Sequence, residues 1–249
     1  MTDHGFRSRW TTVRGLRIHD RSGPGPVALP VVMLHGLAVS HRYLMPTAAV
    51  LSRWHPVVVP DLPGFGLSGK PSHPYDVSEH ADVMADWLAA RGLRRVALAG
   101  HSFGAEVAAR LAVLVPGTVA ALVLASPTTD PRARTRRGLI GRWLVDTAVE
   151  APWQVPILAR DVADAKPWRV LATVGHSVRN RVEDDLVKAG VPTLVLGGSL
   201  DPVAPARWRA EVAALTGGIS VTVPQGAHNV LTTSPRRSAA AIAAHLRDV

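Results

Sequence analysis

The chain has 249 residues, 47% of them hydrophobic, so it can bury one large core of the size of an α/β domain with an insertion. It contains no cysteine, which excludes disulfides, thiolate metal sites and a cysteine nucleophile. The net charge of +9 would attract nucleic acid or anionic membranes if the basic residues formed one face, but arginines occur from Arg7 to Arg247 with acidic residues between them.

The first predicted element is an antiparallel hairpin at a sheet edge, because Trp10 to His19 alternates in polarity around Gly15. The residues before it carry charges but no apolar run, so no secretory signal is visible and a cytoplasmic location is expected. Short runs rich in Val and Leu follow, each bounded by turn residues, which is typical of parallel strands buried on both faces. These runs are Val31 to Leu34, Val57 to Val59, Val96 to Ala99, Leu122 to Leu124, Thr193 to Leu196 and Ser220 to Val223.

Segments with helical apolar spacing separate these strands. They are Val77 to Arg91, Phe103 to Val115, Pro205 to Leu215 and Pro235 to Leu246. The longest uncharged stretch, Leu111 to Thr129, contains Pro116 and Gly117 at its middle, so we interpret it as a helix end followed by a buried strand and expect no membrane span. The order of elements predicts a doubly wound α/β domain with a mostly parallel sheet.

The alternation of strands and helices lapses between about Thr128 and Lys188, where Arg-rich, Trp-containing and Pro-punctuated helical segments occur. We therefore predict a helical cap insertion over residues 128–188, within a core formed by residues 1–127 and 189–249. Three tryptophans of the insertion would dock amphipathic helices on the core, and some of them could line a substrate pocket. They are Trp143, Trp153 and Trp168.

Gly100-His101-Ser102-Phe103-Gly104 lies directly after a predicted strand and directly before a predicted helix. A strand that turns sharply into a helix holds the serine in a strained conformation, and the flanking glycines let neighbouring backbones approach. The hydroxyl of Ser102 is then presented at the carboxyl end of the strand, where ligands bind in open α/β sheets. We predict that Ser102 is a nucleophile.

A serine hydroxyl needs a base and an orienting acid, and both follow in the order Ser, Asp, His that this architecture uses. Asp201 comes just after the strand beginning near Thr193, and His228 lies in a loop after one further helix and strand. For the oxyanion, we expect the N–H of Phe103 and that of Leu37, with Gly36 giving room. His35 has no evident acid partner, so we expect it to fix this loop by hydrogen bonding.

Five motifs in this order resemble the α/β-hydrolase fold serine hydrolases along almost the whole chain. They are His35-Gly36, Asp61 to Ser68, Gly100 to Gly104, Gly197 to Pro202 and Gly226 to Asn229. The resemblance implies a structural rather than a catalytic role for Asp61, and the insertion resembles the cap that covers the pocket in many members. The serine at the elbow disfavours dehalogenase and epoxide hydrolase chemistry, and the triple-glycine loop of some lipases and esterases is absent.

We therefore expect a hydrolase acting on a carboxylic ester, thioester or lactone of a small, largely apolar acyl substrate. Hydrolysis of a carbon–carbon bond, acyl transfer, and a ligand-binding protein without turnover are the alternatives. No metal, no cofactor and no nucleic acid are expected as partners, although salt-sensitive nucleic-acid binding through the arginines between Arg132 and Arg142 is a minor alternative. The oligomeric state is left open.

Overall fold

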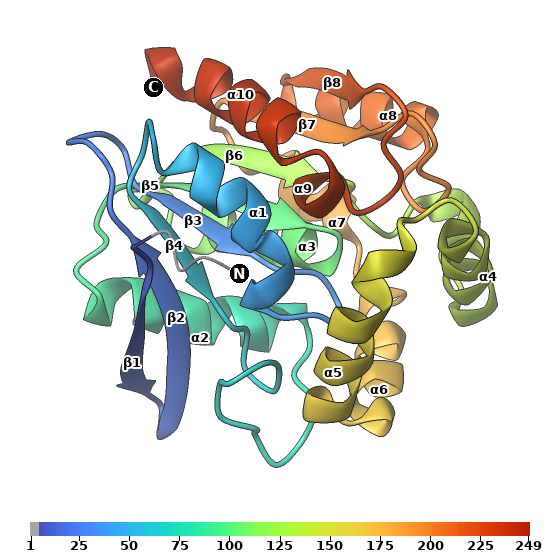
Figure 1. Cartoon of the computed structure of the whole chain (residues 1–249), viewed down its shortest axis with the longest axis horizontal. Helices are drawn as coiled ribbons and strands as arrows, with labels where there is room; N and C mark the ends of the chain where they lie inside the picture. Colours follow the sequence, from blue (N-terminus) through green and yellow to red (C-terminus); the bar gives the residue numbers. More distant parts are fainter. Residues whose placement is uncertain (1–4) are drawn as a thin grey trace.

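The computed structural model describes residues 5–249 and contains an eight-stranded sheet in the order β1-β2-β4-β3-β5-β6-β7-β8 (Figure 1). The first two strands form an antiparallel hairpin, β2 pairs antiparallel with β4, and all other neighbouring strands are parallel. The prediction of a mostly parallel sheet is therefore confirmed. The strands are β1 (Arg7–Val13), β2 (Leu16–Gly23), β3 (Val31–Leu34), β4 (Val57–Pro60), β5 (Val96–His101), β6 (Val119–Ala125), β7 (Thr193–Gly198) and β8 (Ile219–Val223).

Helices cover both faces of this sheet, as the doubly wound arrangement requires. One face carries α1 (His41–Leu51), α9 (Val230–Thr233) and α10 (Pro235–His245), and the chain ends in a short 3-10 helix, η3 (Leu246–Asp248). The other face carries α2 (Val77–Ala90), α3 (Phe103–Leu114) and α8 (Ala206–Thr216). Alternate residues of each inner strand enter the two layers: in β3, Val32 and Leu34 pack on the α2 and α3 side, and Val31 and Met33 on the α1 side.

Between β6 and β7 the chain is helical, and the description of residues 126–192 includes no strand. Figure 1 shows α4, α5 and α6 together on the side of the molecule away from the β1–β2 hairpin. Prolines stand in the first turns of α5 and α6, where a missing N–H costs no helical hydrogen bond. The elements are η1 (Pro131–Ala133), α4 (Arg136–Thr147), η2 (Pro152–Gln154), α5 (Val155–Ala165), α6 (Pro167–Ser177) and α7 (Val182–Leu186).

Within residues 5–249, no helix combines the length and the apolar character needed to cross a lipid bilayer. The uncharged stretch after Leu111 instead ends α3 at Leu114 and then forms β6, as predicted.

The structure differs from the sequence prediction in two places near the amino terminus. The hairpin is longer than predicted, and its turn residues Arg14 and Gly15 both have positive φ, of 48° and 74°, which suits the twist of a two-residue hairpin. Helix α1 was not predicted, because Pro46 stands inside it and interrupts the helical pattern. Ser40 caps this helix by accepting a hydrogen bond from the Arg42 N–H.

Candidate active site

Ser102 lies at a strained turn between β5 and α3, with φ 54° and ψ −121°. The turn is possible only because its neighbours lack side chains: a Cβ on Gly100 would lie 2.2 Å from the Gly104 carbonyl oxygen, and a Cβ on Gly104 would lie 2.4 Å from the Leu34 carbonyl oxygen. A non-glycine residue with positive φ at such a crowded turn costs free energy that the surrounding packing must offset. The geometry is that of the predicted elbow, and it directs Ser102 to the carboxyl end of the sheet.

The structure brings the three predicted side chains into one hydrogen-bonded chain. Nε2 of His228 lies 3.0 Å from Oγ of Ser102, and Nδ1 of His228 lies 3.2 Å from each carboxylate oxygen of Asp201. Asp201 follows β7 and His228 follows β8, so both reach Ser102 from the same end of the parallel strands. All three side chains are buried.

The electrostatics of this chain favour an ionised Asp201 beside a basic His228. Burial acts to raise the pKa of Asp201, but the charge and hydrogen bond of His228 and the Ala204 N–H outweigh it and hold that pKa well below its usual range. Burial acts to lower the pKa of His228, yet Asp201 raises it above the ordinary histidine value. An ionised Asp201 fixes the proton on Nδ1 and leaves Nε2 free to accept from Ser102.

The backbone of His228 is held from two directions. Its carbonyl accepts hydrogen bonds from the side chains of His101 and Ser126, each at 3.0 Å, at the ends of β5 and β6. Its N–H donates to the carboxylate of Asp146 in α4 at 3.2 Å. The next N–H, that of Asn229, donates to Glu150 at 2.6 Å. Sequence reasoning missed these carboxylates, because the bonded partners are about 80 residues apart.

Gly36 lies against Ser102, and Leu37 lines the same cavity. A Cβ on Gly36 would be 3.1 Å from the Cβ of Ser102, so only glycine fits there without displacement. Within residues 5–249, no acceptor pairs with the N–H of Leu37 or of Phe103. His35 donates from Nδ1 to the Gly36 carbonyl at 2.8 Å and accepts from the Leu62 N–H at 2.9 Å, which ties this loop to the loop after β4.

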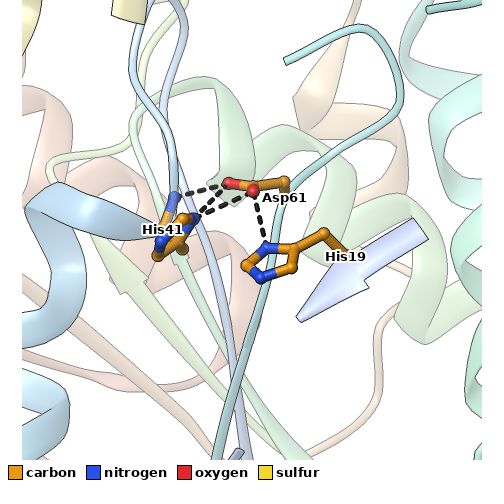
Figure 2. A group of neighbouring side chains, drawn as sticks. All are labelled: His19, His41 and Asp61. Atoms are coloured by element: carbon orange, nitrogen blue, oxygen red, sulfur yellow. Dashed lines mark hydrogen bonds and ion pairs between the residues drawn. The ribbon is translucent and has the colours of Figure 1, made fainter. Parts of the chain in front are cut away.

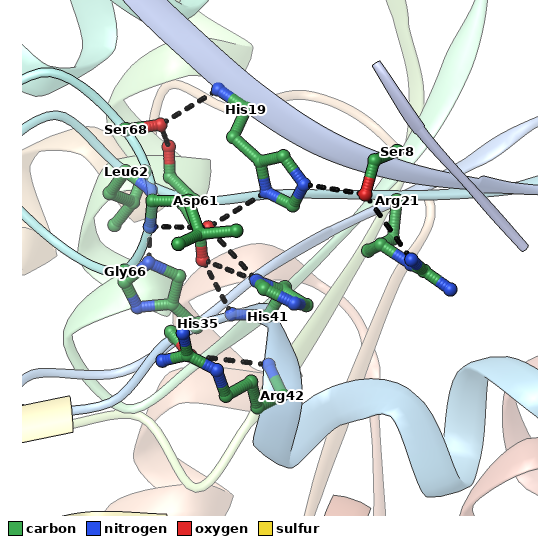
Figure 3. A network of polar contacts seen from close by, with 12 residues as sticks. Ser8, His19, Arg21, His35, His41, Arg42, Asp61, Leu62, Gly66 and Ser68 are labelled. Carbon is green, nitrogen blue, oxygen red and sulfur yellow. Dashed lines mark hydrogen bonds and ion pairs between the residues drawn. The ribbon is translucent and has the colours of Figure 1, made fainter. Parts of the chain in front are cut away.

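The carboxylate of Asp61 connects β2 to the start of α1 through hydrogen bonds (Figure 2). It accepts from Nδ1 of His19 and Nδ1 of His41, both at 2.9 Å, and from the N–H groups of His41 and Leu67 at 2.7 and 3.0 Å. Burial acts to raise the pKa of Asp61, but these histidines lower it far below the usual range. Figure 3 shows how His35, Leu62 and Ser68 extend the same network.

The same three side chains are the only group in the described part of the chain with the composition and spacing of a metal site. One ligand atom from each of His19, His41 and Asp61 lies within 4.8 Å of the others, and all three are buried. Hydrogen bonds already engage these atoms: each Asp61 oxygen accepts at least two. The cluster therefore fits a structural brace for the loop beside His35, and the sequence did not predict that His19 and His41 would join it.

Glu106 is a buried carboxyl group one helical turn beyond Ser102 in α3. It accepts from Thr128 at 2.8 Å, Ser177 at 2.6 Å and Asn180 at 2.8 Å, so it contacts both ends of the helical region between β6 and β7. Burial raises the pKa of Glu106 to about 7 despite these donors. The sequence signal that could have identified Glu106 is its position as a single acidic residue within the apolar run of α3.

A cavity of about 340 Å³ opens beside Ser102 and His228. The core contributes the segment from Gly36 to Val39 to its wall, and α4 to α6 contribute six apolar side chains: Ile140, Trp143, Leu144, Leu158, Val162 and Val170. Of the three tryptophans predicted for this region, Trp143 lines the cavity, and Trp153 and Trp168 do not. A smaller cavity of about 120 Å³ shares Asp146, Leu158 and Asn229 with the larger one. The arrangement can hold an apolar group beside the Ser102 hydroxyl.

Comparison with known proteins agrees with this fold. Over 125 residues, which are 50% of this chain and 33% of the relative, the sequence is 34% identical to an uncharacterized Mycobacterium tuberculosis protein. The matched segments cover only about a third of the length of that protein and of other curated relatives. A membrane phospholipase A structure superposes with a TM-score of 0.82 and 25% identity, covering 99% of this chain and 87% of the other.

A thermophilic esterase from Thermogutta terrifontis superposes with a TM-score of 0.80 and 24% identity, over 97% of this chain and 98% of the esterase, and this likeness is one of fold. The model of the alpha/beta hydrolase family matches residues 31–241, from the first parallel strand into the last helix. The chain therefore belongs to the alpha/beta hydrolase family.

Proposed function

We propose that this protein is a serine hydrolase that cleaves a carboxylic ester, thioester or lactone through an acyl-enzyme intermediate. The observation that carries the proposal is the hydrogen-bonded chain from Asp201 through His228 to Ser102 at the wall of an apolar cavity. A serine hydroxyl becomes an effective nucleophile only when a base removes its proton, and the raised pKa of His228 suits that base.

In the proposed reaction, Nε2 of His228 takes the Ser102 proton while Oγ attacks the carbonyl carbon of the substrate. Asp201 keeps the imidazole in the required tautomer and stabilises its positive charge. The tetrahedral intermediate collapses as His228 returns the proton to the departing alkoxide or thiolate, leaving the acyl group on Ser102. A water molecule then gives a proton to His228 and attacks the acyl carbon, and His228 returns that proton to Oγ of Ser102 as the acid product leaves.

The N–H groups of Leu37 and Phe103 are our candidates for the oxyanion donors. Phe103 follows Ser102 in the chain, Leu37 lines the cavity beside it, and neither N–H donates to another group in residues 5–249. Preorganised donors of this kind lower the barrier because they need not reorient as negative charge develops on the carbonyl oxygen. His35 supports the proposal indirectly, since its two hydrogen bonds fix the loop that contains Gly36 and Leu37.

We further propose that residues 128–188 act as a cap over the catalytic residues. Residues of α4, α5 and α6 make up half of those that line the larger cavity, while the core supplies the proposed reacting groups. Because the cavity wall is mainly apolar, the acyl group or the leaving group of the substrate should be apolar too.

The test is labelling with a fluorophosphonate followed by peptide mapping, together with hydrolysis of chromogenic esters of increasing chain length. The wild-type protein should be labelled on Ser102, and Ser102→Ala should lose labelling and at least about a thousandfold in kcat/KM with its Tm unchanged. Ser72→Ala, an exposed serine with no side-chain hydrogen bond in the described part of the chain, is the matched control.

Near-normal turnover by Ser102→Ala would overturn the assignment. Labelling of Ser102 without hydrolysis of any ester would retain the nucleophile but move the substrate to the carbon–carbon or acyl-transfer alternatives. Absence of labelling in the folded protein would favour a ligand-binding role without turnover.

A further inference from the structure

The outer surface of the region between β6 and β7 is unusually apolar. Eight of the sixteen exposed large hydrophobic residues among the described residues lie between 144 and 171. Four of them belong to α4, η2 and the turn between them: Leu144, Val145, Val149 and Trp153. The other four lie on α5 and α6: Val155, Leu158, Trp168 and Leu171. We call these eight residues the apolar face; such a concentration of exposed side chains marks an interaction surface.

The exposed charged groups of the segment that carries the apolar face, residues 131–171, have one sign. Between residues 131 and 171, all exposed ionisable residues are basic: Arg132, Arg136, Arg137, Arg160 and Lys166. The acidic residues of this stretch are withdrawn: Asp146 and Asp161 are buried, and Glu150 and Asp164 are half-buried in hydrogen bonds. The sequence has acidic residues between the arginines, but here burial withdraws the acidic side chains from the surface.

The apolar face is continuous with the larger cavity. Leu144, which is 66% exposed, and Leu158, which is 42% exposed, both line the cavity that contains Ser102. Val155, 62% exposed, lines the smaller adjoining cavity. An apolar chain leaving a surface in contact with this face would therefore meet apolar side chains along its path to Ser102. In Figure 1, α4, α5 and α6 lie on the same side of the molecule.

We propose that the apolar face binds an anionic lipid surface and that substrates enter the cavity from that surface. Exposed Trp and Leu side chains with surrounding Arg and Lys match the interface between headgroups and acyl chains. A second copy of the chain fits less well, because a two-fold interface would bring the same five cations against one another. The binding stands apart from catalysis; the entry of substrate from the lipid rests on the proposed hydrolase function.

The test is flotation of the Ser102→Ala protein, which cannot consume the lipid, with vesicles of phosphatidylcholine alone or with about one quarter phosphatidylglycerol. Binding to the anionic vesicles should exceed binding to the neutral ones at least about tenfold and should fall when salt is raised to about 0.5 M. Trp153→Ser with Leu171→Ser should lower the binding about tenfold, since neither residue lines the cavities.

The matched control is Trp54→Ser with Ile219→Ser, which removes one exposed Trp and one exposed aliphatic side chain elsewhere on the molecule and should leave binding unchanged. With Ser102 intact, the face variant should hydrolyse a short soluble ester within about twofold of wild type but lose about tenfold on a long-chain ester embedded in vesicles. Absence of vesicle binding, equal binding to both lipids, or equal losses in the two double variants would overturn the proposal. So would a dimer that the face variant dissociates and that does not bind lipid.

If the protein binds anionic vesicles and the face variant does not, the lipid-binding role of the apolar face is supported even when no ester is hydrolysed. Failure of the proposed function would appear separately, as a wild-type protein that binds lipid but is not labelled at Ser102.

Discussion

The N–H of His228 donates a hydrogen bond to the carboxylate of Asp146, a residue of helix α4 that also lines the cavity beside Ser102. Burial raises the pKa of Asp146 to about 6, with Glu150 and Asp201 adding to the effect and His228 opposing it. In turn, the charge of Asp146 contributes to the raised pKa of His228. The pKa of the proposed general base, His228, thus depends partly on a carboxylate in α4.

Replacement of Asp146 by Asn should shift the acid limb of the kcat/KM profile to lower pH by about 0.3 to 1 unit. The amide oxygen still accepts the His228 N–H, but the negative charge that favours the imidazolium form is gone, so the pKa of His228 falls. Asp146→Leu removes the acceptor as well and should lower kcat about tenfold or more. The measurement is the pH dependence of ester hydrolysis; superimposable profiles for wild type and Asp146→Asn would contradict the electrostatic role. Asp184→Asn, an exposed carboxylate on α7, is the charge control.

Gly100→Ala should destabilise the protein by about 3 kcal/mol or more, because the added Cβ would lie 2.2 Å from a backbone oxygen that cannot move without shifting α3. Gly117→Ala is the matched control: a Cβ there meets no atom within 4 Å, so the change should be within about 0.5 kcal/mol of neutral. Urea unfolding of the two variants gives the comparison. Equal stabilities would mean that the elbow is less crowded than its geometry indicates.

Glu106→Gln should remove a pH dependence of stability. The pKa of Glu106 is raised to about 7 in the folded protein, so its stabilising contribution is complete below the unfolded pKa of about 4.5 and is lost as pH rises to 7. The neutral Gln does not titrate, so the variant should be more stable than wild type by about 2 kcal/mol at pH 8.5 and near equal at pH 4.5. Glu211→Gln, on the surface, should change neither value by more than about 0.5 kcal/mol. A constant difference across this range would refute the linkage.

Asp61→Asn should cost about 3 kcal/mol at pH 7, because His19, His41 and two backbone N–H groups lose a charged acceptor in a fully buried position. The depressed pKa of Asp61 means that this stabilisation is present above the unfolded value near 4 and declines as pH falls below it. The difference in unfolding free energy between wild type and variant should therefore narrow in acid. A gap that stays constant between pH 7 and pH 3 would show that Asp61 acts by packing alone.

The features that could be predicted from the sequence are those that depend on residues close together in the chain. The strands, most core helices and the elbow around Ser102 follow from local apolar patterns and glycine spacing, and Asp201 and His228 follow from their positions after strands. Helix α1 was not predicted, because Pro46 interrupts its helical pattern. The contacts of Asp146, Glu106 and His41 could not be read from the sequence, because each joins segments that only the folded sheet brings together.

The acceptors Asp146 and Glu150 also constrain any replacement of the region around α4 by helices from another protein. The sheet supplies Ser102 and Asp201, so a transplanted set of helices could reshape the cavity without rebuilding the proposed nucleophile. Such a graft would still have to present two acceptors, one helical turn apart, to the consecutive N–H groups of His228 and Asn229. Chimeras that omit them should show altered acyl preference together with an impaired base, and restoring the two carboxylates should recover turnover while keeping the new preference.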